Sequence, residues 1–119
     1  MTTNLQSLAA EEFCYLTTVG RVSGKPHEIE IWFGLNDRSL YMLSGGRDRS
    51  DWLKNVRRGP EVTVQIAGED FEGRARVVED AEEDALARRL LVEKYERRPG
   101  SLANWGRTAL PVAVDLWLP

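Results

Sequence analysis

The sequence has few of the residues that build metal and disulfide sites. Its 119 residues include one cysteine, Cys14, and one histidine, His27. A single cysteine excludes an intrachain disulfide, and one cysteine with one histidine is too small a set for the usual zinc sites. We therefore expect no metal site, and we expect Cys14, which lies in an apolar segment, to be a small buried residue.

Long apolar runs and an excess of positive charge are also missing. No stretch approaches the roughly 18 apolar residues of a membrane-spanning helix, and no basic residue precedes Arg21, where a secretory signal would carry its charged start. The formal net charge is −3, which disfavours nucleic acid as a partner. We expect a cytoplasmic protein with no membrane span and no nucleic-acid partner. The length is typical of one domain, which we place at residues 1–119.

Apolar and β-branched residues are distributed as in a mainly β protein. Residues 27–35 alternate, with Ile29, Ile31 and Phe33 on one side and Glu28, Glu30 and Trp32 on the other, which is the period of a half-buried strand. Six strands are expected, at 13–18, 27–35, 40–43, 62–67, 71–78 and 112–117. Because most are joined by hairpins, the pattern favours a six-stranded antiparallel barrel with flanking helices, an α+β arrangement, over a parallel sheet.

Helices are expected at four places between and beside these strands. A short one is predicted at 5–12, and one from Asp48 or Ser50 to residue 58, ended by Gly59 in a left-handed conformation. A longer helix is predicted at 80–98, since Asp80 and Glu83 form a capping-box pattern. One more helical turn is expected at 101–105.

Two segments have the composition of anion-binding sites. The first, the glycine loop, is Ser44-Gly45-Gly46-Arg47 between a strand and a helix, where glycines let backbone N–H groups approach an anion closely. The second, the cationic turn, is residues 21–25, which offer two cations, a hydroxyl and a glycine. Ordinary surface turns explain both segments equally well. His27 has either a structural or a ligand-contact role.

Other candidate functional residues are the paired carboxylates and the tryptophans. Glu28 and Glu30 lie on one side of a strand, about 7 Å apart, which suits either acid–base chemistry or a solvated face. The four tryptophans are expected to be core or interface anchors. Of these, Trp105, next to a glycine in a loop, is best placed to touch a ligand.

A longer motif order resembles that of a known family. Residues 17–26, TTVGRVSGKP, resemble the TTxGRxSGxP opening of the deazaflavin-dependent nitroreductases. The order continues with EIWF at 30–33, SGG at 44–46, a DWxKN motif at 51–55, and a final LPVAV strand. The resemblance implies a split β-barrel, related to the pyridoxamine phosphate oxidases, that binds the deazaflavin coenzyme F-420.

The resemblance also implies which residues surround the cofactor. It implies hydride transfer to an electron-poor small molecule such as a nitroaromatic, a quinone or an enone, with a backbone N–H, Ser44 or a tyrosine stabilising the developing charge. The implied cofactor-binding residues are Arg21, Ser23, Gly24, Lys25, His27, Ser44, Gly45, Gly46, Arg47, Trp52 and Asn55.

Alternatives remain for the cofactor and for the activity. The family often has lysine at the position of Val22 and arginine at that of His27, and this departure keeps flavin mononucleotide (FMN) as the alternative cofactor. A different class of function is a non-catalytic module that binds a deazaflavin, haem or a lipid. Six short strands enclose a thin core, so we also expect a homodimer.

Overall fold

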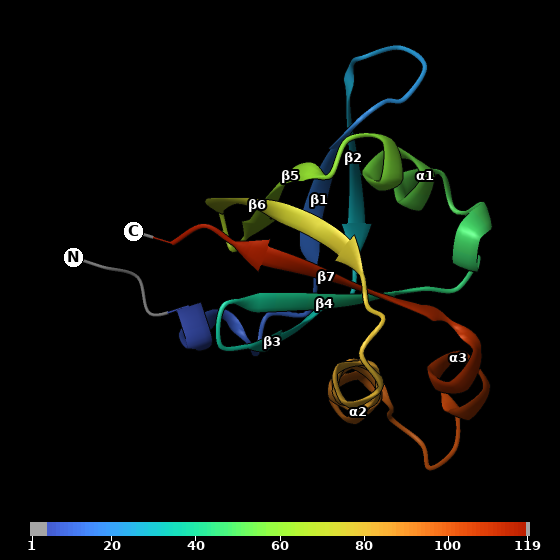
Figure 1. Ribbon diagram of the computed structural model, residues 1–119. Coiled ribbons are helices and arrows are strands. Elements are labelled where there is room, and N and C mark those ends of the chain that lie inside the picture. Colours follow the sequence, from blue (N-terminus) through green and yellow to red (C-terminus); the bar gives the residue numbers. More distant parts are fainter. Residues whose placement is uncertain (1–4, 119) are drawn as a thin grey trace.

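One curled antiparallel sheet organises the chain (Figure 1). The computed structural model describes residues 5–118, and the seven strands follow the order β2-β1-β5-β6-β7-β4-β3. The predicted antiparallel split barrel is therefore confirmed, with one more strand than expected. The strands are β1 (Cys14–Val19), β2 (Pro26–Ile31), β3 (Gly34–Asn36), β4 (Ser39–Ser44), β5 (Glu61–Ile66), β6 (Glu69–Val77) and β7 (Leu110–Leu116).

The additional strand arises because the predicted strand at 27–35 is two strands. It breaks at Trp32 and Phe33, so β2 and β3 lie at opposite edges of the sheet. At the break, the backbone of Phe33 bonds to side chains instead of a neighbouring strand. Its N–H donates to the Tyr95 hydroxyl (3.0 Å), and its carbonyl accepts from Lys94 Nζ (2.9 Å). These contacts satisfy the backbone groups that the interrupted ladder leaves free.

The helices differ from the prediction mainly at their ends. Besides the short turns η1 (Leu5–Leu8) and η2 (Arg47–Arg49), they are α1 (Asp51–Arg58), α2 (Ala81–Tyr95) and α3 (Ala103–Thr108). None of the helices formed by residues 5–118 is long and apolar enough to cross a membrane.

Two predicted helix ends are wrong, one cap differs in conformation, and the last helical turn is displaced. That turn is α3, at Ala103–Thr108 instead of 101–105, so Trp105 lies in a helix and not in a loop. The first helix stops at residue 8 instead of 12, because only Leu5 and Leu8 bury side chains there. The second ends at Arg58 as predicted, but the Gly59 that follows it is extended (φ −137°), not left-handed. The third stops at Tyr95 rather than residue 98, since Glu96 is extended and Pro99 disfavours helix in the residue before it.

The start of α2 joins the helix to the sheet through a polar network. Asp80 caps the helix by accepting from the Glu83 N–H (2.9 Å), as predicted. The Glu83 carboxylate, however, pairs with Arg76 of β6 (2.6 Å) and accepts from the Tyr41 hydroxyl (2.7 Å). The hydrogen bonds from Arg76 lower the pKa of Glu83 to about 2. Burial, and to a smaller extent the hydrogen bond to Glu83, raises the pKa of Tyr41 to about 12.

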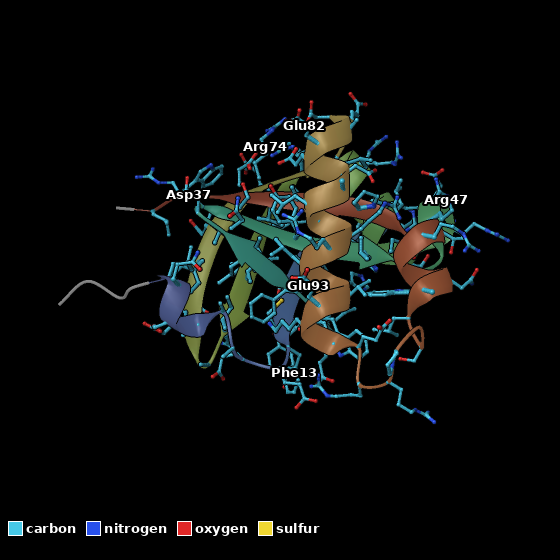
Figure 2. All side chains as sticks on the ribbon, turned by 90° about the horizontal axis from the view of Figure 1, so that it is seen from below. Phe13, Asp37, Arg47, Arg74, Glu82 and Glu93 are labelled. Atoms are coloured by element: carbon cyan, nitrogen blue, oxygen red, sulfur yellow. The ribbon has the colours of Figure 1, made fainter. Side chains whose placement is uncertain are left out.

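Two apolar clusters hold the fold together. One fills the barrel and includes Leu16, Phe33 and Leu53, all without exposed surface. The other lies under α2, which crosses one face of the sheet (Figure 2) and buries Ala87 and Leu91 against it. Cys14 is fully buried as predicted, and burial raises its thiol pKa to about 12, so it stays protonated near neutral pH.

Candidate functional site

A buried asparagine fixes the cationic turn against α1. The side chain of Asn55 is only 5% exposed. Its Oδ1 accepts from the Arg21 backbone N–H (3.2 Å) and from Arg21 Nη1 (2.9 Å), and its Nδ2 donates to Thr18 Oγ1 (3.2 Å). The structure therefore brings together Arg21 and Asn55, two predicted site residues that are 34 positions apart.

A hollow of about 290 Å³ opens beside this contact. Ser23 Oγ accepts from the Lys25 backbone N–H (3.1 Å) and lies 3.4 Å from His27 Nε2. Gly20 leaves room for these side chains, because a Cβ there would lie 2.5 Å from His27 Nε2 and the ring would have to shift. The residues that line the hollow are Gly20, Arg21, Val22, Ser23, His27, Asp51 and Asn55.

The Arg21 guanidinium already has an acidic neighbour in this hollow. Arg21 Nη2 lies 3.3 Å from Asp51 Oδ1, and the Asp51 carboxylate is 86% exposed. Sequence reasoning did not include Asp51 in the site, although its place at the start of α1 was available as a signal. An anion bound to Arg21 would compete with Asp51. Such an exposed ion pair is weak, about 1 kcal/mol or less, and is readily exchanged.

The glycine loop follows β4 and is held by its own hydroxyls. Ser44 Oγ donates to the Arg47 carbonyl (2.9 Å) and lies 2.7 Å from Ser50 Oγ. Ser50 thus occupies the N-cap position of α1 without a capping side-chain hydrogen bond. Among residues 5–118, the N–H groups of Gly45 and Gly46 have no hydrogen-bond acceptor. Two exposed donors are therefore free to receive a ligand.

The structure also places four other predicted site residues, Gly24, Lys25, Arg47 and Trp52. The Arg47 guanidinium donates to the Thr108 carbonyl at the end of α3. Trp52 is half-buried and packs against the barrel core. Lys25 and Gly24 are exposed at the tip of the cationic turn, with Gly24 in the left-handed region (φ 73°).

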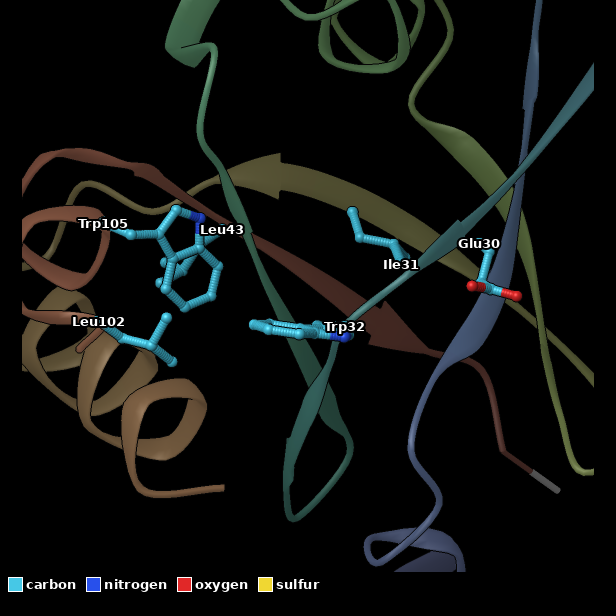
Figure 3. Close-up of a pocket in the computed structure, with 6 residues that line it drawn as sticks. All are labelled: Glu30, Ile31, Trp32, Leu43, Leu102 and Trp105. Atoms are coloured by element: carbon cyan, nitrogen blue, oxygen red, sulfur yellow. The ribbon is translucent and has the colours of Figure 1, made fainter. Parts of the chain in front are cut away.

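An apolar cleft of about 490 Å³ lies between the edge of β2 and α3 (Figure 3). Trp32 and Trp105 form its walls, with ring centroids 5.7 Å apart and planes at 88°. Trp32 also stacks on Tyr95 with centroids 4.3 Å apart. The Glu30 side chain points away from Trp105. The lining residues are Glu30, Ile31, Trp32, Leu43, Leu102 and Trp105.

Sequence reasoning found only part of this cleft. It singled out Trp105 as a ligand contact but placed Trp32 on the solvent face of a continuous strand. Trp32 is 40% exposed and lies directly after the end of β2, so its ring does not follow the alternation of the strand. The end of the strand at this position is the feature that sequence reasoning missed.

The glycine loop lies beside the cleft, and β2 runs along both the cleft and the hollow. A Cβ added to Gly45 would lie 3.6 Å from the Trp105 indole, so the loop borders the cleft. β2 passes along both, since His27 lines the hollow and Ile31 lines the cleft. The arrangement suits a molecule with an anionic tail and a flat apolar ring. Among the described residues, no group of acidic, histidine and cysteine side chains could hold a metal ion.

Solved structures with the same fold include several reductases. An F-420-H2 dependent reductase superposes with a TM-score of 0.70 at 24% identity, covering 87% of this chain and 93% of that one. A candidate pyridoxamine 5'-phosphate oxidase from Listeria innocua has a TM-score of 0.70 at 19% identity, covering 94% and 89%. A chain solved as a domain-swapped dimer has a TM-score of 0.70 at 26% identity, covering 87% and 79%.

The sequence itself carries the family assignment. No curated protein matches the chain, but residues 2–116 match the family described as F-420H(2)-dependent quinone reductase. The match includes the cationic turn, the glycine loop, and both walls of the apolar cleft. The split barrel agrees with it, because reductases that use the same cofactor share this fold. The chain therefore belongs to the F-420H(2)-dependent quinone reductase family of oxidoreductases.

Proposed function

We propose that this chain transfers hydride from reduced coenzyme F-420 to an electron-poor small molecule, such as a quinone, a nitroaromatic or an enone. One observation carries the proposal: β2 passes along both a hollow that contains Arg21 and an aromatic cleft that the glycine loop borders. The hollow matches an anionic tail in charge, and the cleft matches flat rings in shape and polarity. We further propose that residues 1–119 act as one domain.

The cofactor-binding residues have distinct roles in this proposal. Arg21, Ser23, Lys25 and His27 supply cations and donors for the anionic tail. Gly45 and Gly46 supply free backbone N–H groups. Asn55 acts indirectly, since it holds Arg21, and Trp52 acts indirectly by packing α1 onto the barrel. Gly24, Ser44 and Arg47 shape the two loops.

The apolar cleft supplies water exclusion and orientation for the acceptor. The reduced deazaflavin supplies the hydride when it is bound. Trp32, Trp105 and Leu102 present apolar surface to the acceptor and exclude water from its reacting face.

A hydrogen-bond donor near the acceptor would stabilise the negative charge that develops on it. The Ser44 hydroxyl already donates to the Arg47 carbonyl, and the hydroxyls of Tyr41 and Tyr95 donate to Glu83 and to the Glu12 carbonyl. Among residues 5–118, the N–H groups of Gly45 and Gly46 have no acceptor and are the backbone donors that the glycine loop offers near the cleft. We therefore assign charge stabilisation to the backbone of the glycine loop.

The proposal is tested by binding and then by turnover. Fluorescence titrations with oxidised F-420 and with FMN should give the lower Kd for F-420. Addition of reduced F-420 and a quinone should then give catalytic oxidation of the cofactor, followed by its absorbance. Tighter binding of FMN would transfer the proposal to an FMN-dependent oxidoreductase, and tight F-420 binding with no turnover on any acceptor class would favour a non-catalytic module.

We also propose that the protein is a homodimer. A structural neighbour at 26% identity was solved as a domain-swapped dimer, and exposed apolar side chains such as Val19 (50%) and Trp117 (53%) lie on the barrel surface. Light scattering during size-exclusion chromatography should give twice the 13.5 kDa chain mass. A single-chain mass across the micromolar range would contradict the proposal.

A further inference from the structure

We propose that Arg47 is a positioning residue that holds Trp105 against the glycine loop and thereby sets the size of acceptor that the apolar cleft admits. The inference rests on the proposed function, because it takes the cleft as the acceptor site. It departs from the expectation that Arg47 binds the cofactor's anionic tail directly.

The position of Trp105 depends on how α3 is held. The helix has six residues, too few to be stable by itself. On one side it packs closely on α2, because a Cβ on Gly106 would lie 2.6 Å from Val92 Cγ2. Arg88 of α2 reinforces this side by donating to the carbonyls of Gly106 (2.9 Å) and Arg107 (3.0 Å).

The other side of α3 faces the glycine loop, and Arg47 makes the hydrogen bond between them. Its guanidinium donates to the Thr108 carbonyl, one of the C-terminal carbonyls that lack a partner within the helix. A cation at this end also complements the helix dipole. Figure 2 shows Arg47 beside α3. The backbone at Arg47 is left-handed (φ 53°), which a non-glycine residue rarely adopts, and this conformation accompanies the side chain's reach to α3.

The Arg47 contact places the Trp105 ring where two parts of the site meet. A Cβ on Gly45 would lie 3.6 Å from the indole on one side, and on the other side the indole is in edge-to-face contact with Trp32, its neighbour in the lining of the cleft. If Arg47 releases Thr108, α3 stays attached to α2 through Arg88, but Trp105 is no longer held toward the loop. The Trp105–Trp32 contact is then no longer fixed, the cleft loses its fixed shape on this side, and discrimination between small and large acceptors decreases.

The test compares Arg47→Asn with Arg49→Asn. Asparagine tolerates the left-handed backbone at position 47 but is too short to reach Thr108. Arg49 lies in the same turn, and its guanidinium has no hydrogen bond or ion pair to any of residues 5–118. Its replacement therefore makes the same change in charge without touching α3. Arg47→Lys, which keeps charge and reach, serves as the conservative rescue.

Two measurements are made on each variant. The first is acrylamide quenching of tryptophan fluorescence in the cofactor-free protein, with Trp105→Phe as the background that isolates the Trp105 signal. The second is the ratio of kcat/KM for a monocyclic benzoquinone to that for a bicyclic naphthoquinone with reduced F-420. Arg47→Asn should increase quenching of Trp105 and change the ratio by about threefold to tenfold, which is what the loss of one charge-assisted hydrogen bond at an exposed site allows. Arg49→Asn and Arg47→Lys should stay within about twofold of the parent protein.

The outcomes separate this inference from the proposed function. Unchanged Trp105 quenching in Arg47→Asn overturns the inference whether or not the protein is an active reductase. An unchanged acceptor ratio combined with a salt-dependent loss of F-420 affinity overturns it as well, and assigns Arg47 to the anionic tail. Absence of both cofactor binding and turnover in the parent protein counts against the proposed function alone, and the quenching result then decides the positioning role.

Discussion

Replacing Asn55 by alanine should destabilise the protein and loosen the cationic turn together. The change removes three hydrogen bonds, two with Arg21 and one with Thr18. Thr18 is only 1% exposed, so its hydroxyl would lose its buried partner. At about 1 kcal/mol for each hydrogen bond, plus about 1 kcal/mol or more for the unpaired buried group, the free energy of unfolding should fall by about 2 to 4 kcal/mol. Urea denaturation measures this loss.

A double-mutant cycle with Thr18→Val separates the two contributions. Thr18→Val removes the hydroxyl while keeping the side-chain shape, so Asn55→Ala leaves no orphaned group at position 18 in that background. The double variant should be more stable, by about 1 kcal/mol, than the sum of the single effects predicts. A loss below about 0.5 kcal/mol for Asn55→Ala, or strict additivity in the cycle, would refute the view that Asn55 is a buried link between β1 and the turn.

Three further predictions concern the cofactor site and the polar network. Arg21→Gln should weaken F-420 binding about tenfold at low salt and less at high salt, whereas Glu28→Gln, outside the hollow, should change the Kd little; equal effects would contradict the anion site. Gly45→Val should weaken F-420 binding. The variant should remain folded, as circular dichroism can verify, because the φ of Gly45 is not positive and the nearest atom to an added Cβ is 3.6 Å away. Glu83→Gln should lower the free energy of unfolding by about 1 to 2 kcal/mol near neutral pH, after allowance for partial exposure. Since Arg76 lowers the Glu83 pKa from 4.5 to about 2, this stabilisation is complete above pH 4.5 and is lost as the pH falls toward 2, which denaturation curves across this range would follow.

The strands could be predicted from the sequence because their burial alternates. In β1, Cys14, Leu16 and Thr18 face the core while their neighbours face outward, and this period is visible in the sequence. The break at Trp32 could not be predicted in the same way. Its cause is Lys94 and Tyr95, which satisfy the Phe33 backbone from about 60 positions along the chain. A local pattern contains no information about such a distant partner.

The candidate site was predictable where a motif carries it. The cationic turn and the glycine loop were recognised from residue order, and the structure brings Arg21 next to Asn55. The apolar cleft was mostly missed, because its walls come from separate elements that only the fold brings together. The conformation of the glycine loop could not be predicted from its composition. Its left-handed residue is Arg47, whereas neither Gly45 nor Gly46 has a positive φ, and Arg47 is also the residue whose side chain reaches α3.

The interruption between β2 and β3 leaves a gap between the two edge strands of the barrel, here called the seam, which is closed at one end. β2 and β3 form the two outer edges of the sheet, yet Trp32 and Phe33 join them covalently. Beyond Gly34, which pairs with Tyr41, β3 no longer covers β4, so the seam is open from Leu43 to the glycine loop. In the proposed function, a ligand with a ring and an anionic tail lies with its ring at the cleft beside Trp32 and its tail toward the cationic turn. Substitutions in the cationic turn can then change which anionic group is bound without changing the surroundings of the ring. Cofactor preference and acceptor range can therefore vary independently of each other in proteins with this fold.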